Sequence, residues 1–439
     1  MKILKFGGTS VGSIERIQAL PMLINEDTPK IVVLSAMSGT TNSLVEIATA
    51  LHANEESRAK ELIKTLHKKY EEVIKGLYKT DPALQKGKEL LTAHFNYLEE
   101  FTNNPFSINE ERAILAQGEL LSTAMFHYYL EEIKTDSVLI PALNFMRIDE
   151  HEEPDISYIE KTLKEELSKH PNTKLFITQG YICRNAFGEI DNLKRGGSDY
   201  TATIIGAAIH AKEIQIWTDI DGMHNNDPRI VEKTHPIAEL SFDEAAELAY
   251  FGAKILHPTC ILPAQTRNIP VRLLNTMQPD AKGTIISDKQ SADSFKAVAA
   301  KDGITAITIK SGRMLLAYGY LRAVFEIFER YKTPIDMITT SEVAVSLTID
   351  NTKNLDPILA ELKAFCSVKV DTDLTIVCIV GNFEATKEGY ALRIFESLKN
   401  IPIRMISYGG SEHNVSILID TKQKKNTLTA LNNGLFLTN

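Results

Sequence analysis

The stretch MKILKFGGTSVG, residues 1–12, is the part of the sequence that decides how the chain is interpreted. A mostly apolar run over residues 3–6 is typical of a buried strand. The strand is broken at Gly7 and Gly8, and an apolar pattern with helical spacing follows from Ser13. The first residues therefore predict a strand, a glycine turn and a helix in immediate succession.

Such a turn can hold a phosphate group. Glycines allow the backbone to approach an anion closely, free N–H groups donate to it, and the helix dipole favours negative charge. Lys5 lies at the end of the strand, where an ammonium group can reach the same anion. The spacing matches neither G-x-x-x-x-G-K-[ST] nor G-x-G-x-x-G. From these residues alone, a phosphate site and a plain tight turn both remain open.

Composition limits the class of protein. At 439 residues the chain is long enough for two or three domains. Hydrophobic residues make up 44% and charged residues 24%, which is typical of a globular protein. A net charge of −9 argues against a surface for nucleic acids or anionic membranes.

The four cysteines form no C-x-x-C pair and no zinc spacing, which is typical of unpaired thiols in a reducing compartment. No apolar run reaches the length of a transmembrane helix, and the N-terminus enters a strand directly, without a signal peptide. We therefore expect a cytoplasmic protein.

Strands and helices alternate along the first two thirds of the chain. Apolar strands are expected at residues 30–35, 138–141, 175–179 and 213–217. A charged stretch over 52–103 has one apolar stripe at helical spacing, which favours a helical cover over the sheet. We expect an α/β fold, a mainly parallel sheet flanked by helices, with ligands at the carboxyl ends of the strands.

The last third of the chain contains an internal repeat. Residues 311–350 and 381–420 are similar at an offset of 70, and Gly319 and Gly389 are among the identical pairs. The pattern predicts two α+β modules of the βαββαβ type. We place a catalytic domain at 1–290 and a regulatory region with the two modules at 291–439.

The string KFGGTSV at residues 5–11 resembles the signature of aspartate kinases, within the amino-acid kinase family. The strings GELLST (118–123), RGGSD (195–199), TDIDG (218–222) and FGAKILHP (251–258) follow in the family's order. The repeats resemble ACT domains, the modules that sense small molecules in these kinases. The resemblance covers essentially the whole chain.

The resemblance implies an aspartate kinase, which uses ATP to phosphorylate the side-chain carboxylate of L-aspartate and forms 4-phospho-L-aspartate. This is the first step of lysine, threonine and methionine biosynthesis. The chain is too short for a fused homoserine dehydrogenase, so we expect a monofunctional enzyme. A carboxylate is already ionised at neutral pH, so the reaction needs no general base. It needs cations, N–H donors and alignment of two anions.

The resemblance also assigns residues to roles. The catalytic residues it implies are Lys5 and Asp199. The residues that would contact aspartate are Thr41, Glu119, Tyr181, Arg195 and Ser198. The residues that would contact ATP are Lys5, Gly7, Gly8, Ser10, Thr218, Asp219, Arg229 and Lys254. Mg²⁺ is expected on the nucleotide, and no residue of the chain is assigned as a metal ligand.

Two departures from the family pattern concern the site. Asn192-Leu193-Lys194 stands where relatives commonly have Thr-Leu-Gly, and His224 replaces an aromatic residue that follows the Asp-Gly turn. Neither change removes a group that the chemistry needs.

An amino-acid effector, lysine in similar enzymes, is implied for the ACT modules. The residues implied for its site are Met314, Gly319, Leu321, Asp336, Thr340, Ser341 and Glu342. Leu316 and Ala317 stand where relatives often have polar residues, so we expect weakened lysine inhibition. ACT modules of the family pair between subunits, which implies a homodimer or a dimer of dimers.

Two alternatives to the aspartate kinase remain from the sequence. One is a kinase for glutamate or another small amino acid. The other is a catalytically inactive amino-acid sensor that works through its ACT repeat. The set of Lys5, Glu119, Arg195 and Asp199 argues against the sensor, which has no need of these residues.

Overall fold

The computed structural model describes residues 1–193, 196–252, 257–289, 295–311, 318–384 and 388–437. The chain forms two compact units. The first unit contains Met1–Met223 and Leu256–Asp288, and the second contains His224–Ile255 and Lys289–Asn439. The segment that begins at His224 thus packs with the C-terminal unit.

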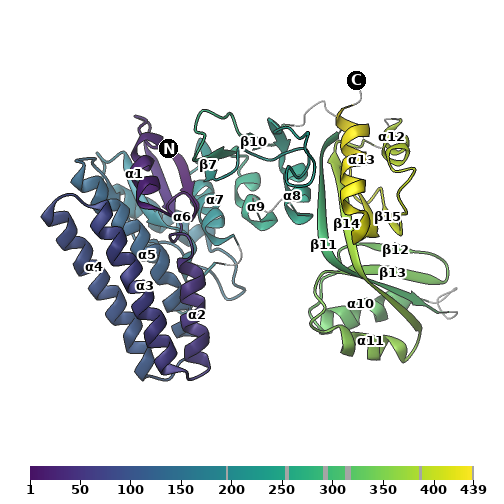
Figure 1. The fold of residues 1–439 in the computed structure, drawn as a ribbon, viewed down its shortest axis with the longest axis horizontal. Helices are drawn as coiled ribbons and strands as arrows, with labels where there is room; N and C mark the ends of the chain where they lie inside the picture. The colour runs from purple at the N-terminus through teal and green to yellow at the C-terminus, as the bar shows by residue number, and fades with distance from the viewer. Residues whose placement is uncertain (194–195, 253–256, 290–294, 312–317, 385–387, 438–439) are drawn as a thin grey trace. The chain divides into compact units, whose positions relative to one another are not determined.

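A mainly parallel sheet forms the centre of the first unit (Figure 1), as the sequence predicts. Its strands run in the order β3-β4-β2-β1-β7-β9-β10, and β10 alone among these is antiparallel to its neighbour. Their bounds are β1 (Lys2–Phe6), β2 (Lys30–Leu34), β3 (Val138–Leu139), β4 (Leu175–Gln179), β7 (Glu213–Thr218), β9 (Val271–Asn275) and β10 (Thr284–Ser287). Phe6 is in register with Leu34 on one side and Trp217 on the other, so three strands end at one level.

Helices cover the sheet of the first unit. Their bounds are α1 (Ile14–Leu23), α2 (Thr40–His52), α3 (Glu56–Leu77), α4 (Asp81–Glu100), α5 (Ile108–Glu132), α6 (Ile156–Ser168), α7 (Gly197–Ala208) and α9 (Pro258–Thr266). The predicted helical cover over 52–103 corresponds to α3 and α4, which run beside α2 and α5 (Figure 1). A short hairpin, β5 (Ile182–Arg184) and β6 (Ile190–Asn192), follows β4.

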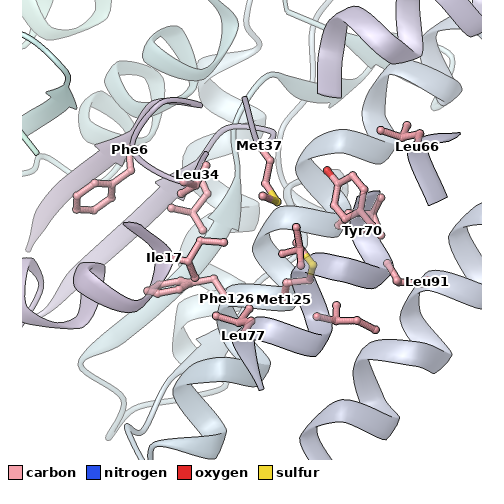
Figure 2. Packing of buried hydrophobic residues seen from close by; sticks show 14 of the residues in the cluster. Phe6, Ile17, Leu34, Met37, Leu66, Tyr70, Leu77, Leu91, Met125 and Phe126 are labelled. Atoms are coloured by element: carbon pink, nitrogen blue, oxygen red, sulfur yellow. The ribbon is translucent and has the colours of Figure 1, made fainter. Parts of the chain in front are cut away.

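One hydrophobic cluster joins the sheet to the helices (Figure 2). It includes Phe6 of β1, Leu34 of β2, Ile17 of α1, Tyr70 of α3 and Phe126 of α5, all at most 2% exposed. The apolar stripe of α3 is therefore part of the main core of the first unit. Burying these side chains contributes about 1.5–3 kcal/mol each to stability.

The second unit is built on an antiparallel sheet, which has six strands among the described residues, in the order β12-β13-β11-β14-β16-β15. The strands are β11 (Phe295–Lys310), β12 (Ile338–Thr340), β13 (Ala344–Ile349), β14 (Ser367–Gly381), β15 (Met405–Ser407) and β16 (Asn414–Asp420). The helices are α8 (Phe242–Tyr250), α10 (Tyr320–Arg330), α11 (Leu355–Lys363), α12 (Tyr390–Ser397) and α13 (Lys424–Phe436). A further short strand, β8 (Glu239–Ser241), leads into α8, whose first turn carries a capping box.

The two sequence repeats form two βαββαβ copies, and they share their longest strands. The ladder between β11 and β14 shifts register near Lys301 and Ile304, and the two sides of this shift belong to different copies. Residues 304–310 pack with the first copy, whereas Val298 packs in the core of the second. The second copy therefore takes one strand from chain that precedes the first copy.

The repeat extends to backbone conformation. Gly319 and Gly389 occupy the residue before α10 and α12, with φ angles of +81° and +92°. Side chains are disfavoured in this left-handed region, which accounts for glycine at the same place in both copies. Among the described residues, no helix is long and apolar enough to span a membrane.

We expect Leu34→Ala to lower the free energy of unfolding by about 2–5 kcal/mol, because the substitution leaves a cavity in a fully buried position of the central sheet. Met22→Ala is the matched control, since Met22 is 78% exposed and its loss should change stability by less than about 0.5 kcal/mol. Thermal unfolding followed by circular dichroism would measure both. Equal melting temperatures for the two variants would contradict this account of the core.

Candidate active site

A cavity of about 800 Å³ lies at the carboxyl ends of β1, β2, β4 and β7, within the first unit. It is lined by Lys5, Gly7, Gly8, Thr9, Ser35, Ala36, Met37, Ser38, Gly39, Thr41, Asn42, Glu119, Tyr181, Leu193, Gly196, Gly197, Ser198, Asp199, Thr218 and Asp219. Ten of the residues that the sequence predicts as catalytic, substrate-binding or nucleotide-binding are in this set. These residues lie close together because the loops that follow parallel strands lie at the same edge of the sheet.

The Gly7-Gly8 turn is in close contact with the loop after β2. A Cβ atom on Gly8 would lie 2.9 Å from the carbonyl oxygen of Ala36, so a side chain there would collide with backbone. The Ser38 N–H donates to the Gly8 carbonyl at 3.2 Å, and the Gly7 N–H donates to the Trp217 carbonyl at 3.1 Å. The turn is thus fixed between the loops that follow β2 and β7.

Lys5 and Asp199 form an ion pair at the cavity wall. The distance between Lys5 Nζ and Asp199 Oδ1 is 2.6 Å, and the side chains are 10% and 14% exposed. Asp199 lies in the first turn of α7, where the helix dipole favours a carboxylate. The pair presents an ammonium group whose position is set from two elements, β1 and α7.

Glu119 of α5 is a buried carboxyl group with one free oxygen. Its Oε1 accepts the Ala36 N–H at 3.1 Å, whereas Oε2 is buried and accepts no hydrogen bond from the residues that the structure describes. Burial raises the pKa of Glu119 to about 8, against the opposing effects of the Ala36 N–H and of Lys5. An unpaired buried oxygen is costly, so the site favours a ligand that brings a donor or a positive charge.

Tyr181, after β4, has a φ angle of +67°, which is strained for an aromatic residue. Its N–H donates to Thr201 Oγ1 at 2.9 Å, and burial raises the pKa of its hydroxyl to about 12. A Cβ atom on Gly197 would lie 2.5 Å from the Tyr181 ring, so the glycine makes room for the aromatic side chain. Strain of this kind is concentrated at functional sites.

The residues predicted to contact nucleotide fall into three groups. Lys5, Gly7, Gly8, Thr218 and Asp219 line the cavity, and the Thr218 hydroxyl donates to Asp219 Oδ1 at 3.1 Å.

Ser10 does not line the cavity. Its hydroxyl is buried, 2.6 Å from Thr276 Oγ1, and braces the turn. Arg229 lies in the second unit, exposed and paired with both carboxylate oxygens of Asp227. Arg195 and Lys254 lie outside the described residues.

Several lining residues were not selected from the sequence, notably Ser35, Met37, Ser38 and Gly39 in the loop after β2. The sequence could have indicated these residues, because a polar loop that follows a central parallel strand lies at the edge of the sheet where ligands bind. Ser122 Oγ donates to the Ser35 carbonyl at 2.7 Å, so α5 helps to hold this loop.

The described residues among those predicted for the effector site lie in or beside the first copy of the repeat. Asp336 is buried, and its Oδ1 accepts hydrogen bonds from Lys301 Nζ and the Tyr250 hydroxyl, both at 2.8 Å. Lys301 also pairs with Asp350 at 2.8 Å. Burial lowers the pKa of Lys301, but the hydrogen bonds that its ammonium group donates to the two carboxylates outweigh this effect, and the net shift of the pKa is upward.

The other predicted effector residues are spread over three segments. Gly319 and Leu321 lie at the start of α10, Thr340 ends β12, and Ser341 and Glu342 are in the exposed turn that follows. Met314, Leu316 and Ala317 lie outside the described residues.

Comparison with known proteins agrees with this fold. Residues 1–275 match the model of the amino acid kinase family, and residues 377–435 match an ACT domain. The chain is 34% identical to lysine-sensitive aspartokinase 3 of Escherichia coli, over 99% of both chains. The chain belongs to the aspartokinases. It is also 34% identical to aspartokinase 1 of Arabidopsis thaliana, covering 99% of the chain and 80% of that relative.

Solved aspartokinase structures show the same architecture. The E. coli aspartokinase III complex with aspartate and ADP, in the R-state, has a TM-score of 0.85 at 33% identity, covering 99% of this chain and 100% of that one. The complex of the same enzyme with lysine and aspartate, in the T-state, has a TM-score of 0.82 at 34% identity and covers 99% of each chain. The predicted fold class, a kinase sheet with ACT modules, is confirmed.

Glu119→Gln should raise stability relative to the wild type as the pH increases. The pKa of Glu119, about 8 in the folded chain, lies above its ordinary value of 4.5. The folded state is therefore favoured most below about pH 4.5 and loses this contribution as the pH rises towards 8. Glutamine does not ionise, so the melting temperature of the variant should exceed that of the wild type increasingly between about pH 5 and pH 8.

The control for this measurement is Glu61→Gln, an exposed glutamate of α3. Its melting temperature should stay parallel to the wild-type curve over the same pH range. A Glu119→Gln curve that also runs parallel would contradict a buried, proton-bearing Glu119.

Proposed function

We propose that this aspartokinase transfers the γ-phosphoryl group of ATP to the side-chain carboxylate of L-aspartate, and that the product is 4-phospho-L-aspartate. The observation that carries the proposal is one cavity that holds the Lys5–Asp199 pair, the Gly7-Gly8 turn and the unpaired Glu119 carboxyl. The aspartate and ADP in the E. coli aspartokinase III complex support these reactants.

Recognition of aspartate would use the buried carboxyl group first. The ammonium group of the substrate supplies the positive charge that Glu119 lacks, and on binding it would displace the proton that burial keeps there. Thr41, Tyr181 and Ser198 line the same cavity and would surround the rest of the molecule. Arg195, from the resemblance, would bind the α-carboxylate in a bidentate manner.

Catalysis would depend on charge stabilisation. The attacking carboxylate is already ionised, so the protein has only to align it and to offset charge on the transferring phosphoryl group. Lys5 would do this from the end of β1, with Asp199 holding its ammonium group in place. The N–H groups of the Gly7-Gly8 turn would donate to phosphate oxygens.

Nucleotide would bind through Thr218 and Asp219 at the end of β7, with its phosphates towards Gly7 and Gly8. Mg²⁺, when bound, would neutralise phosphate charge. The cavity carries the Asp199 and Asp219 carboxylates, and Mg²⁺ in kinases is typically held by one or two carboxylates with the phosphates, so the residues fit the ion. The described residues contain no cluster that would hold a metal ion without the nucleotide.

The reaction would begin the synthesis of lysine, threonine and methionine, and the ACT copies would adjust it to the supply of an amino acid. The lysine bound in the T-state complex of E. coli aspartokinase III supports lysine as the effector. Asp336 would take part through its second oxygen, which is buried and accepts no hydrogen bond within the described part of the chain. Pairing of ACT modules between subunits would give a homodimer or a dimer of dimers.

Lys5→Ala should reduce turnover by about 10²-fold or more, because the transferring phosphoryl group loses the Lys5 ammonium group that would stabilise its charge. The assay is a hydroxylamine trap for the acyl phosphate, run with ATP, Mg²⁺ and L-aspartate. Lys2→Ala is the matched control, since Lys2 lies on the same strand, pairs with Glu26 and is not among the residues that line the cavity.

The trap assay also separates the rival functions. Product with glutamate but not with aspartate would identify a kinase for another amino acid. The absence of product with any small acid would favour the catalytically inactive amino-acid sensor. An unchanged rate for Lys5→Ala would refute the role given to Lys5.

Lysine should lower the rate in the trap assay, and Asp336→Asn should make the enzyme less sensitive to lysine, because an effector ammonium would lose its carboxylate. Asp356→Asn, an exposed residue in the first turn of α11, is the control and should leave the inhibition unchanged. A wild-type rate that is indifferent to lysine, threonine and methionine would contradict regulation by these amino acids.

A further inference from the structure

Two consecutive residues of α3 reach the back of the loop that lines the cavity. Lys69 Nζ donates a hydrogen bond to the Ser38 carbonyl oxygen at 3.0 Å. The Tyr70 hydroxyl lies 2.9 Å from Thr40 Oγ1. Ser38 and Thr40 stand on either side of Gly39, so both contacts hold the same turn, whose other side faces the cavity.

This turn needs support from outside. Gly39 has a φ angle of +79° and precedes the first residue of α2 without a side-chain cap. The Thr40 N–H donates to the Met37 carbonyl at 3.0 Å, so the chain reverses within four residues. The Ser38 N–H also donates to the Gly8 carbonyl. A displacement of Ser38 would therefore reach the Gly7-Gly8 turn, where phosphate is proposed to bind.

Tyr70 is suited to hold this turn because it belongs to the core (Figure 2). Its ring is fully buried among the residues that join α3 to the sheet, so its hydroxyl group has a fixed position. Thr40 is also fully buried. One hydroxyl group therefore donates to the other away from water, and the bond ties the first residue of α2 to the core.

Among the residues that the structure describes, the Lys69 ammonium group has no acidic partner. Its Nζ contacts the Ser38 carbonyl, and no carboxylate of the described residues lies within ion-pair distance of it. Burial lowers the pKa of Lys69, as expected for an ammonium group that is partly removed from water and not neutralised. Nζ would lie 3.7 Å from a Cβ atom on Gly39, beside the positive end of the α2 dipole.

Two sources of positive potential therefore lie together behind the cavity wall. Both reactants of the proposed reaction are anions, and their binding would supply the missing negative charge.

We propose that Lys69 and Tyr70 are positioning residues of the active site: they hold the Ser38–Thr40 turn from behind, and the Lys69 ammonium group favours anionic reactants in the cavity. The inference rests on the proposed kinase function. The helix α3, which the sequence predicts only as a cover over the sheet, would then also contribute to substrate binding.

The test compares three lysine variants in the full-length chain. Lys69→Met removes the charge and the donor, Lys69→Arg keeps both, and Lys68→Met removes an exposed charge one residue earlier on the same helix. For each, kcat and the KM values for aspartate and ATP are measured at low and high salt, with the melting temperature. The wild-type rate is measured in the same series.

Lys69→Met should raise the KM for aspartate, for ATP or for both by about 5-fold to 10-fold at low salt, with kcat within about 3-fold of the wild type. The increase should shrink at high salt, because ions screen the lost charge. Lys69→Arg should recover most of the loss, and Lys68→Met should match the wild type. Tyr70→Phe should raise the same KM without salt dependence, since it removes a neutral hydrogen bond.

KM values for Lys69→Met that equal those of Lys68→Met would overturn the proposal. So would a loss in Lys69→Arg as large as that in Lys69→Met, or a lowered melting temperature without a change in KM. A wild-type chain that forms no product with aspartate would instead contradict the proposed function, so the two failures are distinguishable.

Discussion

The position of β1 at the centre of a parallel sheet is the constraint on which the active site depends. Phe6 is in register with Leu34 and Trp217, so the loops after β1, β2 and β7 begin at one level and meet. Gly8 then has to pass the Ala36 carbonyl at a distance that no side chain permits. The glycine pair is thus required by packing between strands as well as by any ligand.

The charges of the site are arranged in two different ways. Lys5 and Asp199 neutralise one another and are ready before any ligand binds. Glu119 and Lys69 form no ion pair with the described residues. Burial raises the pKa of Glu119 and lowers the pKa of Lys69, so it favours the neutral form of each. A zwitterionic substrate and a polyanionic nucleotide would supply the opposite charges that these two groups lack, and their binding would favour the ionised form of each.

Much of the fold could be predicted because hydrophobic periodicity is local. The strand at 175–179 has the expected bounds, and the 70-residue repeat appears as two copies with glycine before the helix in each. Helix starts were less certain, because capping is decided by backbone geometry. For example, α2 begins at Thr40, directly after the left-handed Gly39.

The site could be predicted only in part, for a physical reason. Motif strings identify residues such as Lys5 and Glu119, but the contacts that hold Ser38 or pair Asp336 with Lys301 join distant segments. Such contacts follow from tertiary packing, which periodicity does not encode. Ser10 illustrates this point, because a hydroxyl beside a glycine turn can face either a ligand or, as here, Thr276.

The shared strands of the ACT copies have a consequence for how the regulatory unit folds. Its second copy is complete only when residues 295–301 have returned to pair with 376–381. During synthesis, residues 295–301 are made before the first copy, so they cannot pair until residues 376–381 have been made. The two copies are therefore joined through one long strand, and a cut of the chain between them would leave the second copy without residues 295–301 and its sheet with a new open edge at β14.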